Sequence, residues 1–167
     1  MKQKLTQIVF WVYILFIIDI VAIKFTGSIA LIKSRMDTMQ WNREKYGIWN
    51  YNIVPFKTIR AAIESYITLG FDRSVVNSIA NVVLFVPMGL LLPLIMRRPS
   101  FVKVMFLSLS IIFTIELFQL ITCLGIADID DVILNFLGCI IGYGMQSTYN
   151  KVRETRRGEK KEFLESN

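Results

Sequence analysis

Three carboxylates and one amide stand together at the start of an apolar segment. Asp128, Asp130 and Asp131 precede the apolar run, and Asn135 follows one helical turn later. Oxygen ligands of this kind suit a hard cation such as Mg²⁺ or Ca²⁺. The simpler alternative is helix capping by Asp128 or Asp130, with Asp131 at the positive end of the helix dipole. Capping uses one carboxylate or two, so the third favours a site for a cation or a cationic ligand group.

Other polar residues interrupt the apolar segments at helical spacing. Asn77 and Asn81 are four residues apart, and Glu116 and Gln119 are three apart, so each pair shares one helix face. An unpaired carboxylate in mid-membrane costs about 2.5 to 3.5 kcal/mol, so Glu116 needs a partner, water or a proton. Two alternatives remain open: Glu116 with Gln119 forms a hydrogen-bonded strut, and Asp19 faces headgroup water.

The composition is that of an integral membrane protein. The chain has 167 residues, of which 54% are hydrophobic and 19% charged, and its net charge is +6. The basic residues surround apolar segments, which favours membrane orientation over nucleic-acid binding. The sequence contains no histidine, which excludes imidazole bases and histidine-ligated zinc. Cys123 and Cys139 lie in apolar segments, so no disulfide is expected.

Four apolar segments are long enough to cross a bilayer. They are residues 5–23, 75–96, 101–124 and 131–149. The first is expected to be retained, because it lacks a convincing signal-peptide cleavage site; a cleaved signal is the alternative. The predicted fold is therefore all-α, a polytopic bundle of four transmembrane helices. Its predicted regions are the N-terminal helix (1–23), an extracytoplasmic loop (24–74), a three-helix core (75–149) and a charged tail (150–167), helical at first and then disordered.

The long loop contains an amphipathic helix. Pro55 is expected in its first turn. Five apolar residues fall within an arc of about 100° on a helical wheel, which favours a helix lying in the membrane interface. They are Phe56, Ile59, Ile63, Tyr66 and Ile67. A soluble loop helix packed on the bundle is the alternative. Aromatic residues before it are expected at headgroup depth: Trp41, Tyr46, Trp49 and Tyr51.

Basic residues in short flanks predict the orientation. They precede the first helix, fill the turn between the second and third, and follow the fourth, so both termini should be cytoplasmic. These residues are Lys2, Lys4, Arg97, Arg98, Lys103, Lys151, Arg153, Arg156, Arg157, Lys160 and Lys161. The polar side chains of all four helices then belong to the outer leaflet. Their faces should converge there on one wet pocket.

Small residues continue the polar stripe of the last helix. Asp131, Asn135, Gly138 and Gly142 follow one another at intervals of four, three and four. Glycines four apart allow another helix to approach closely. In the second helix, Pro87 and Pro93 each remove a backbone donor, which predicts a kink.

In order and spacing, four motifs resemble the VanZ-like family of bacterial membrane proteins. They are Asn52-x-x-Pro55-Phe56, Asn81-x-x-x-Phe85-x-Pro87-x-Gly89, Glu116-x-x-Gln119, and Asp128-x-Asp130-Asp131-x-x-x-Asn135-x-x-Gly138-x-x-x-Gly142. The resemblance covers roughly residues 50–147. It implies a protein of the bacterial cytoplasmic membrane; the family's namesake lowers susceptibility to the glycopeptide teicoplanin. The resemblance does not imply an enzyme.

The leading functional prediction is a modulator of envelope susceptibility that binds a polar ligand in an outward-facing acidic cavity. The ligand is expected to be a lipid-linked cell-wall intermediate held through a divalent cation, or the cationic part of a glycopeptide. The predicted ligand-binding residues are Glu116, Gln119, Asp128, Asp130, Asp131, Asn135, Asn77 and Asn81.

Two other functions remain open. One is an intramembrane enzyme acting on a lipid-linked precursor, with Glu116 as acid or base and a carboxylate-held metal polarising phosphate. The other is a small ion-coupled transporter, against which the lack of an inverted repeat argues.

Overall fold

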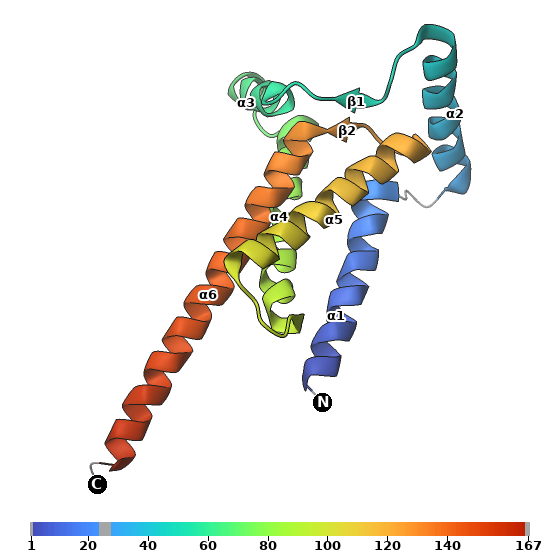
Figure 1. The fold of residues 1–167 in the computed structure, drawn as a ribbon. Helices are drawn as coiled ribbons and strands as arrows, with labels where there is room; N and C mark the ends of the chain where they lie inside the picture. Colours follow the sequence, from blue (N-terminus) through green and yellow to red (C-terminus); the bar gives the residue numbers. More distant parts are fainter. Residues whose placement is uncertain (1, 24–27, 166–167) are drawn as a thin grey trace.

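The computed structural model describes residues 2–23 and 28–165, and most of them are helical (Figure 1). The helices are α1 (Lys2–Ile17), its π-helical continuation η1 (Ile18–Ile23), α2 (Ile29–Tyr46), α3 (Lys57–Leu69), α4 (Arg73–Ile95), α5 (Phe101–Thr122) and α6 (Ile129–Glu165). This mostly helical chain agrees with the predicted fold class. Two short strands, β1 (Tyr51–Asn52) and β2 (Ala127–Asp128), add a two-residue bridge. Residues 24–27 of the predicted loop and 166–167 of the predicted tail lie outside the described residues.

Within the described residues, three segments are long and apolar enough to cross a membrane: Gln3–Val21, Arg73–Ile95 and Phe101–Thr122. They correspond to the first three predicted spans. The predicted fourth span, 131–149, is helical throughout but is not one of the three. It forms the first half of α6, which continues past Asn150 to Glu165, so the tail is helical further than predicted. The fourth crossing stays a prediction.

Helices α4 and α6 run parallel and touch backbone to backbone. A Cβ atom built on Gly138 would lie 2.2 Å from the carbonyl oxygen of Val82, and one on Gly142 would lie 2.0 Å from that of Val86. A Cβ atom on Gly89 would likewise lie 2.0 Å from the carbonyl oxygen of Cys139. The predicted small-residue ridge is therefore confirmed as the contact between these two helices.

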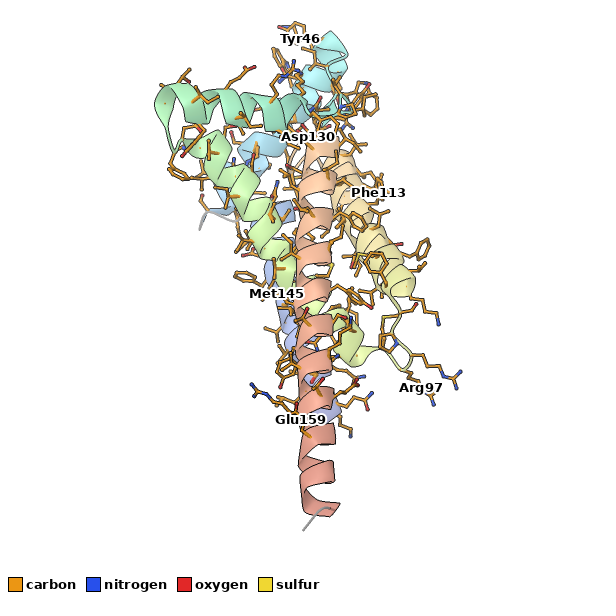
Figure 2. All side chains as sticks on the ribbon, turned by 90° about the vertical axis from the view of Figure 1, so that its left-hand side faces the viewer. Tyr46, Arg97, Phe113, Asp130, Met145 and Glu159 are labelled. Atoms are coloured by element: carbon orange, nitrogen blue, oxygen red, sulfur yellow. The ribbon has the colours of Figure 1, made fainter. Side chains whose placement is uncertain are left out.

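The core of the bundle lies between α1, α4, α5 and α6. Its fully buried apolar side chains come from all four helices: Ile17, Phe85, Met88, Leu92, Val104, Ile112 and Cys139. The two chain ends lie toward one end of the bundle, whereas β1, β2, α2 and α3 lie at the other (Figure 1). Asp130 and Arg97 mark these opposite ends in Figure 2, where α3 lies across the end that carries Asp130.

Helix α2 was not predicted from the sequence. It begins after Ser28, whose hydroxyl accepts the N–H of Leu31, and it ends at Gly47, which adopts a left-handed φ of 64°. No residue of α2 is buried, although all of them are described. A helix that buries no face needs no apolar stripe, so its sequence gives no periodic signal.

Helix α3 confirms a helix in the second half of the loop but begins later than predicted. Its first residue is Lys57, and Phe56 before it has a left-handed φ of 63°, so Pro55 lies outside the helix. Ala62 is its buried residue, whereas large apolar side chains such as Ile63 and Ile67 are exposed. The placement of α3 in a membrane interface stays a prediction.

Asp72 caps the first turn of α4 and makes this turn sensitive to acid. Its carboxylate accepts the N–H of Val75 at 3.0 Å, and this bond together with the Ser65 side chain holds the pKa of Asp72 below its ordinary value of 3.8. A depressed pKa contributes stability that is complete above the unfolded value and is lost as pH falls through the folded value. We expect the amide protection of Val75 and Val76 to fall as pH drops below 3.8.

Hydrogen exchange measured by mass spectrometry checks this pH dependence. Asp72→Asn is the matched control, because the amide retains a capping oxygen but does not titrate. An equal loss of protection in Asp72→Asn would show that another group titrates.

Candidate functional site

A two-residue parallel bridge joins distant parts of the chain next to the acidic residues. Tyr51 pairs with Ala127, and Asn52 pairs with Asp128. The N–H of Ala127 also donates to the carbonyl of Asn50 at 3.0 Å. The bridge fixes the segment that follows α2 against the segment that enters α6.

Asp128 caps α6 and fastens β1 to it. Its carboxylate accepts the N–H of Asp130 at 2.9 Å, which confirms the predicted capping role. It also accepts the side-chain amide of Asn52 at 3.0 Å and the hydroxyl of Thr58 at 2.6 Å. One carboxylate therefore accepts bonds from the start of α6, from β1 and from the first turn of α3.

Asp130 caps a different helix from its own. Its carboxylate is fully buried and accepts the N–H groups of Phe56 at 2.6 Å, Thr58 at 2.7 Å and Ile59 at 3.1 Å. These donors belong to the start of α3, where helix N–H groups lack intrahelical partners and the dipole is positive. Figure 2 shows Asp130 at the top of α6, where α3 crosses. Asp130 thus anchors α3 to the bundle.

Asp131 binds a side chain of α4. Its carboxylate accepts the side-chain amide of Asn81 at 2.5 Å, which joins α6 to α4 above the glycine ridge. The three aspartates together therefore connect α6 to β1, α3 and α4. Across the described residues, no group of three or more Asp, Glu or Cys side chains is arranged to hold a metal ion. The divalent cation stays a prediction.

Glu116 and Gln119 lie buried on α5, each bound to a different backbone group. Glu116 Oε2 accepts the N–H of Asp128 at 3.1 Å, so it supports the entry to α6. Gln119 Nε2 donates to the carbonyl of Val21 at 2.7 Å, in the π-helical turn at the end of the first span. Each residue thus links α5 to another element.

The remaining predicted residues do not join this network. Asn77 on α4 and Asp19 on η1 are exposed. Asn135 is fully buried, and neither of its amide atoms has a hydrogen-bond partner in the described part of the chain.

A groove lies where β1, β2, α5 and the start of α6 meet, with a volume of about 380 Å³. Of the eight predicted ligand-binding residues, Glu116 and Asp128 line it. Asn52 adds an amide. Most of the residues that line the groove are apolar, including Ile53, Phe113, Leu117 and Val132. The structure thus offers an almost entirely apolar groove, in place of the acidic pocket shared by four helices that the sequence predicted.

Arginine and asparagine side chains that sequence reasoning missed close the end of α5. Arg43 donates to the carbonyl of Leu120 at 2.9 Å and to Asn50 Oδ1 at 2.6 Å. Asn50 in turn donates to the carbonyls of Gln119 at 3.2 Å and Gly125 at 2.8 Å. The carbonyls of Gln119 and Leu120 are unsatisfied acceptors at the C-terminus of α5, where a cation is also favoured by the helix dipole. No local pattern could reveal bonds that cross about 70 residues.

The sequence of the chain matches a known family. The sequence profile described as VanZ/LLP1 matches residues 10–150. The chain belongs to the VanZ/LLP1 family. The match includes the second half of α1 and all of α2, so the family region is longer than the residues 50–147 that carry the motif resemblance.

One relative carries the VanZ name. The chain is 39% identical over 77 residues to Protein VanZ of Enterococcus faecium, which covers 44% of this chain and 45% of that protein. The chain thus spans less than half the length of this VanZ relative. No solved structure matches the chain.

Proposed function

We propose that this VanZ-family chain lowers susceptibility to teicoplanin-type glycopeptides by binding an amphipathic envelope ligand in the groove between β1, β2, α5 and α6. The observation that carries this proposal is the groove itself, whose lining is almost entirely apolar. Family membership and the similarity to Protein VanZ support the glycopeptide phenotype.

The proposed setting is the bacterial cytoplasmic membrane, with both termini cytoplasmic. Three apolar helices support this placement, and the first half of α6 supplies a fourth crossing. The basic turn with Arg97 and Arg98 lies away from the end that carries Asp130 (Figure 2). Under the positive-inside rule, the end with β1, β2 and α3 then faces outward. The groove opens on the side where glycopeptides and cell-wall intermediates are found.

The chemistry of the groove favours the hydrocarbon part of an amphipathic ligand. Phe113, Leu117 and Val132 offer surface to a hydrocarbon chain, because burying apolar area stabilises a complex by about 25 cal/mol per Å². Glu116 and Asn52 also line the groove, but the Glu116 carboxylate is buried and accepts the N–H of Asp128, and the Asn52 amide donates to Asp128 and Thr58, so they leave almost no polar surface in it. A lipid-linked cell-wall intermediate has an apolar part of this kind, and so does a glycopeptide bound through an apolar part.

Filling the groove should remove the phenotype. Leu117 lines the groove and is 55% exposed, so Leu117→Trp places an indole in the ligand's space with little effect on the core. We expect ligand binding to weaken about tenfold or more, which corresponds to about 1.4 kcal/mol. The measurement is the teicoplanin concentration that inhibits growth of cells with matched membrane levels of each variant.

Phe118→Trp is the matched control, because Phe118 follows on the same helix, is 40% exposed and does not line the groove. It should leave susceptibility as in the parent. If Leu117→Trp also leaves susceptibility unchanged, the groove is not the site. If the parent chain itself gives no protection, the glycopeptide role is wrong.

A further inference from the structure

The half of α6 that follows Asn150 carries three arginines on one face. Arg153, Arg156 and Arg157 are all exposed, and they occupy positions i, i+3 and i+4 of a continuous helix. Side chains at this spacing are neighbours, with Cβ atoms about 5–6 Å apart, so their guanidinium groups can reach one anion or two adjoining ones. We call these three residues the arginine stripe. Figure 2 marks this part of α6 with Glu159, toward the end of the bundle that carries Arg97.

The arginine stripe continues the face of α6 that packs on α4. Gly142, Tyr149 and Arg153 follow one another at intervals of seven and four residues, which keeps them on one side of the helix. Gly142 lies against the backbone of α4, which ends at Ile95. Tyr149 and the arginines on the same side are exposed. The stripe therefore lies where α4 no longer covers α6.

The glutamates next to the stripe lie on other faces of α6. Glu154 and Glu159 are exposed, about 100° and 120° around the helix from Arg153, so they border the stripe without interrupting it. Lys151 is also exposed but lies almost opposite Arg153, about 160° away. Orientation in a membrane requires basic residues near the end of a span but no particular helix face. The separation of arginine from glutamate therefore indicates a surface that binds anions.

The contact between α6 and α4 gives the depth of the stripe in a membrane. A Cβ atom on Gly89 would lie 2.0 Å from the carbonyl oxygen of Cys139 and 2.7 Å from the amide nitrogen of Tyr143. Because the two helices run parallel, the end of the α4 membrane segment, six residues beyond Gly89, is level with the last turn of α6 before Asn150. Arg153 then lies about 6 to 9 Å beyond this level. A headgroup layer is about 5–8 Å thick and a long basic side chain reaches toward it, so the stripe meets lipid phosphates.

We propose that the arginine stripe binds the phosphate groups of anionic phospholipids at the inner surface of the membrane. The inference rests on the membrane placement given in the proposed function, but not on the ligand of the groove. Guanidinium groups bind phosphate through paired hydrogen bonds, and basic residues directly beyond a membrane span attract anionic lipids. Lipid bound on this face holds the projecting half of α6 beside the end of α4.

Fluorescence quenching by brominated lipids tests this site. The three natural tryptophans, Trp11, Trp41 and Trp49, are each about half exposed or more, so they can be replaced by phenylalanine. Tyr149→Trp then reports from the face of the stripe, one turn before Arg153, in liposomes that contain brominated phosphatidylglycerol or brominated phosphatidylcholine. We expect phosphatidylglycerol to bind about tenfold more tightly or better, because each arginine contributes about fivefold, equivalent to about 1 kcal/mol. Both leaflets of these liposomes have the same composition, so the orientation of the protein does not affect the result.

Substitutions on two faces of α6 identify the site. Replacing Arg153, Arg156 and Arg157 by glutamine should bring the binding of the two lipids at Tyr149→Trp close to equal. Arg153→Gln alone should lower the preference about fivefold. Lys151→Gln is the matched control, because it removes one positive charge two residues nearer the membrane but on the opposite face, and it should change the preference less than about twofold. Circular dichroism checks that each variant retains its helices.

Equal binding of the two lipids at Tyr149→Trp would overturn the proposal, and so would a preference that survives the three glutamine substitutions. An equal loss from Lys151→Gln and Arg153→Gln would also overturn it, since general positive charge would then explain the preference. A lack of quenching by either lipid would remove the fourth membrane crossing and the proposal with it. Lipid preference is measured without glycopeptide, and the growth assay with Leu117→Trp leaves the stripe intact, so failure of the groove as the ligand site is a separate result.

Discussion

Replacing Asp130 by alanine should destabilise the protein by about 3 kcal/mol or more and release the start of α3. The change leaves the N–H groups of Phe56, Thr58 and Ile59 without their acceptor in a buried place. Hydrogen bonds to an ionised group contribute about 1.5 to 3 kcal/mol each, and orphaned buried donors add a desolvation cost. The measurement is thermal unfolding in detergent micelles, together with protease cleavage of residues 53–60.

Asp37→Ala is the control for the loss of an acidic side chain. Asp37 is exposed on α2, so its replacement should change stability by less than about 0.5 kcal/mol. Asp130→Asn should fall between the two, because the amide keeps one acceptor oxygen but turns a donor toward other donors. A stable, protease-resistant Asp130→Ala protein would show that α3 is held by other contacts.

Replacing Gly142 by alanine should separate α4 from α6 at a cost of about 3 kcal/mol or more. The added Cβ would lie 2.0 Å from the carbonyl oxygen of Val86 and 3.0 Å from the amide nitrogen of Leu90. Both are backbone atoms of a helix, so no side-chain rotation relieves the contact. Thermal unfolding in detergent measures the loss.

Gly144→Ala provides the control on the same helix. A Cβ at Gly144 meets no described atom within 4 Å, and alanine favours helix over glycine by about 1 kcal/mol. This variant should be as stable as the parent or slightly more so. Equal stability of Gly142→Ala and Gly144→Ala would contradict the close approach of the two helices.

Local periodicity made much of the bundle predictable. Apolar length identified three helices that could span a membrane, and a stride of four and three residues placed Asp131, Gly138 and Gly142 on one face. The bond between Asn81 and Asp131 agrees with the prediction that their helices meet at one level. Apolar length and residue spacing depend only on residues within one helix, so they can be recognised in a single sequence.

Contacts between distant segments were not predictable from local patterns. Capping rules concern a helix and its own flanks, whereas Asp130 caps a helix that begins more than 70 residues earlier. The same separation hid the role of Arg43 at the end of α5. The four family motifs prove to be contact partners. Asn52 and the N–H of Phe56 bind Asp128 and Asp130, Asn81 binds Asp131, and Glu116 binds the N–H of Asp128.

The candidate site in the structure differs from the predicted acidic pocket for a physical reason. Counting carboxylates predicted an acidic pocket, but a sequence does not show which backbone N–H groups will face them. Asp128 and Asp130 turn their oxygens toward such groups, and apolar residues from α5 and β1 line the groove beside them. The predicted fourth span, residues 131–149, is not among the three segments apolar enough to cross a membrane, because polar residues lower the mean hydropathy of this helix.

The length of α6 has a mechanical consequence. At 1.5 Å per residue, its 37 residues extend about 55 Å, whereas the hydrocarbon of a bilayer is about 30 Å thick. The half that packs on α4 is clamped by glycine contacts, and the remainder projects with Glu159 beyond the bundle (Figure 2). Because α6 is held at its first half, a small tilt of the helix near Asp131 produces a larger displacement of its C-terminal end.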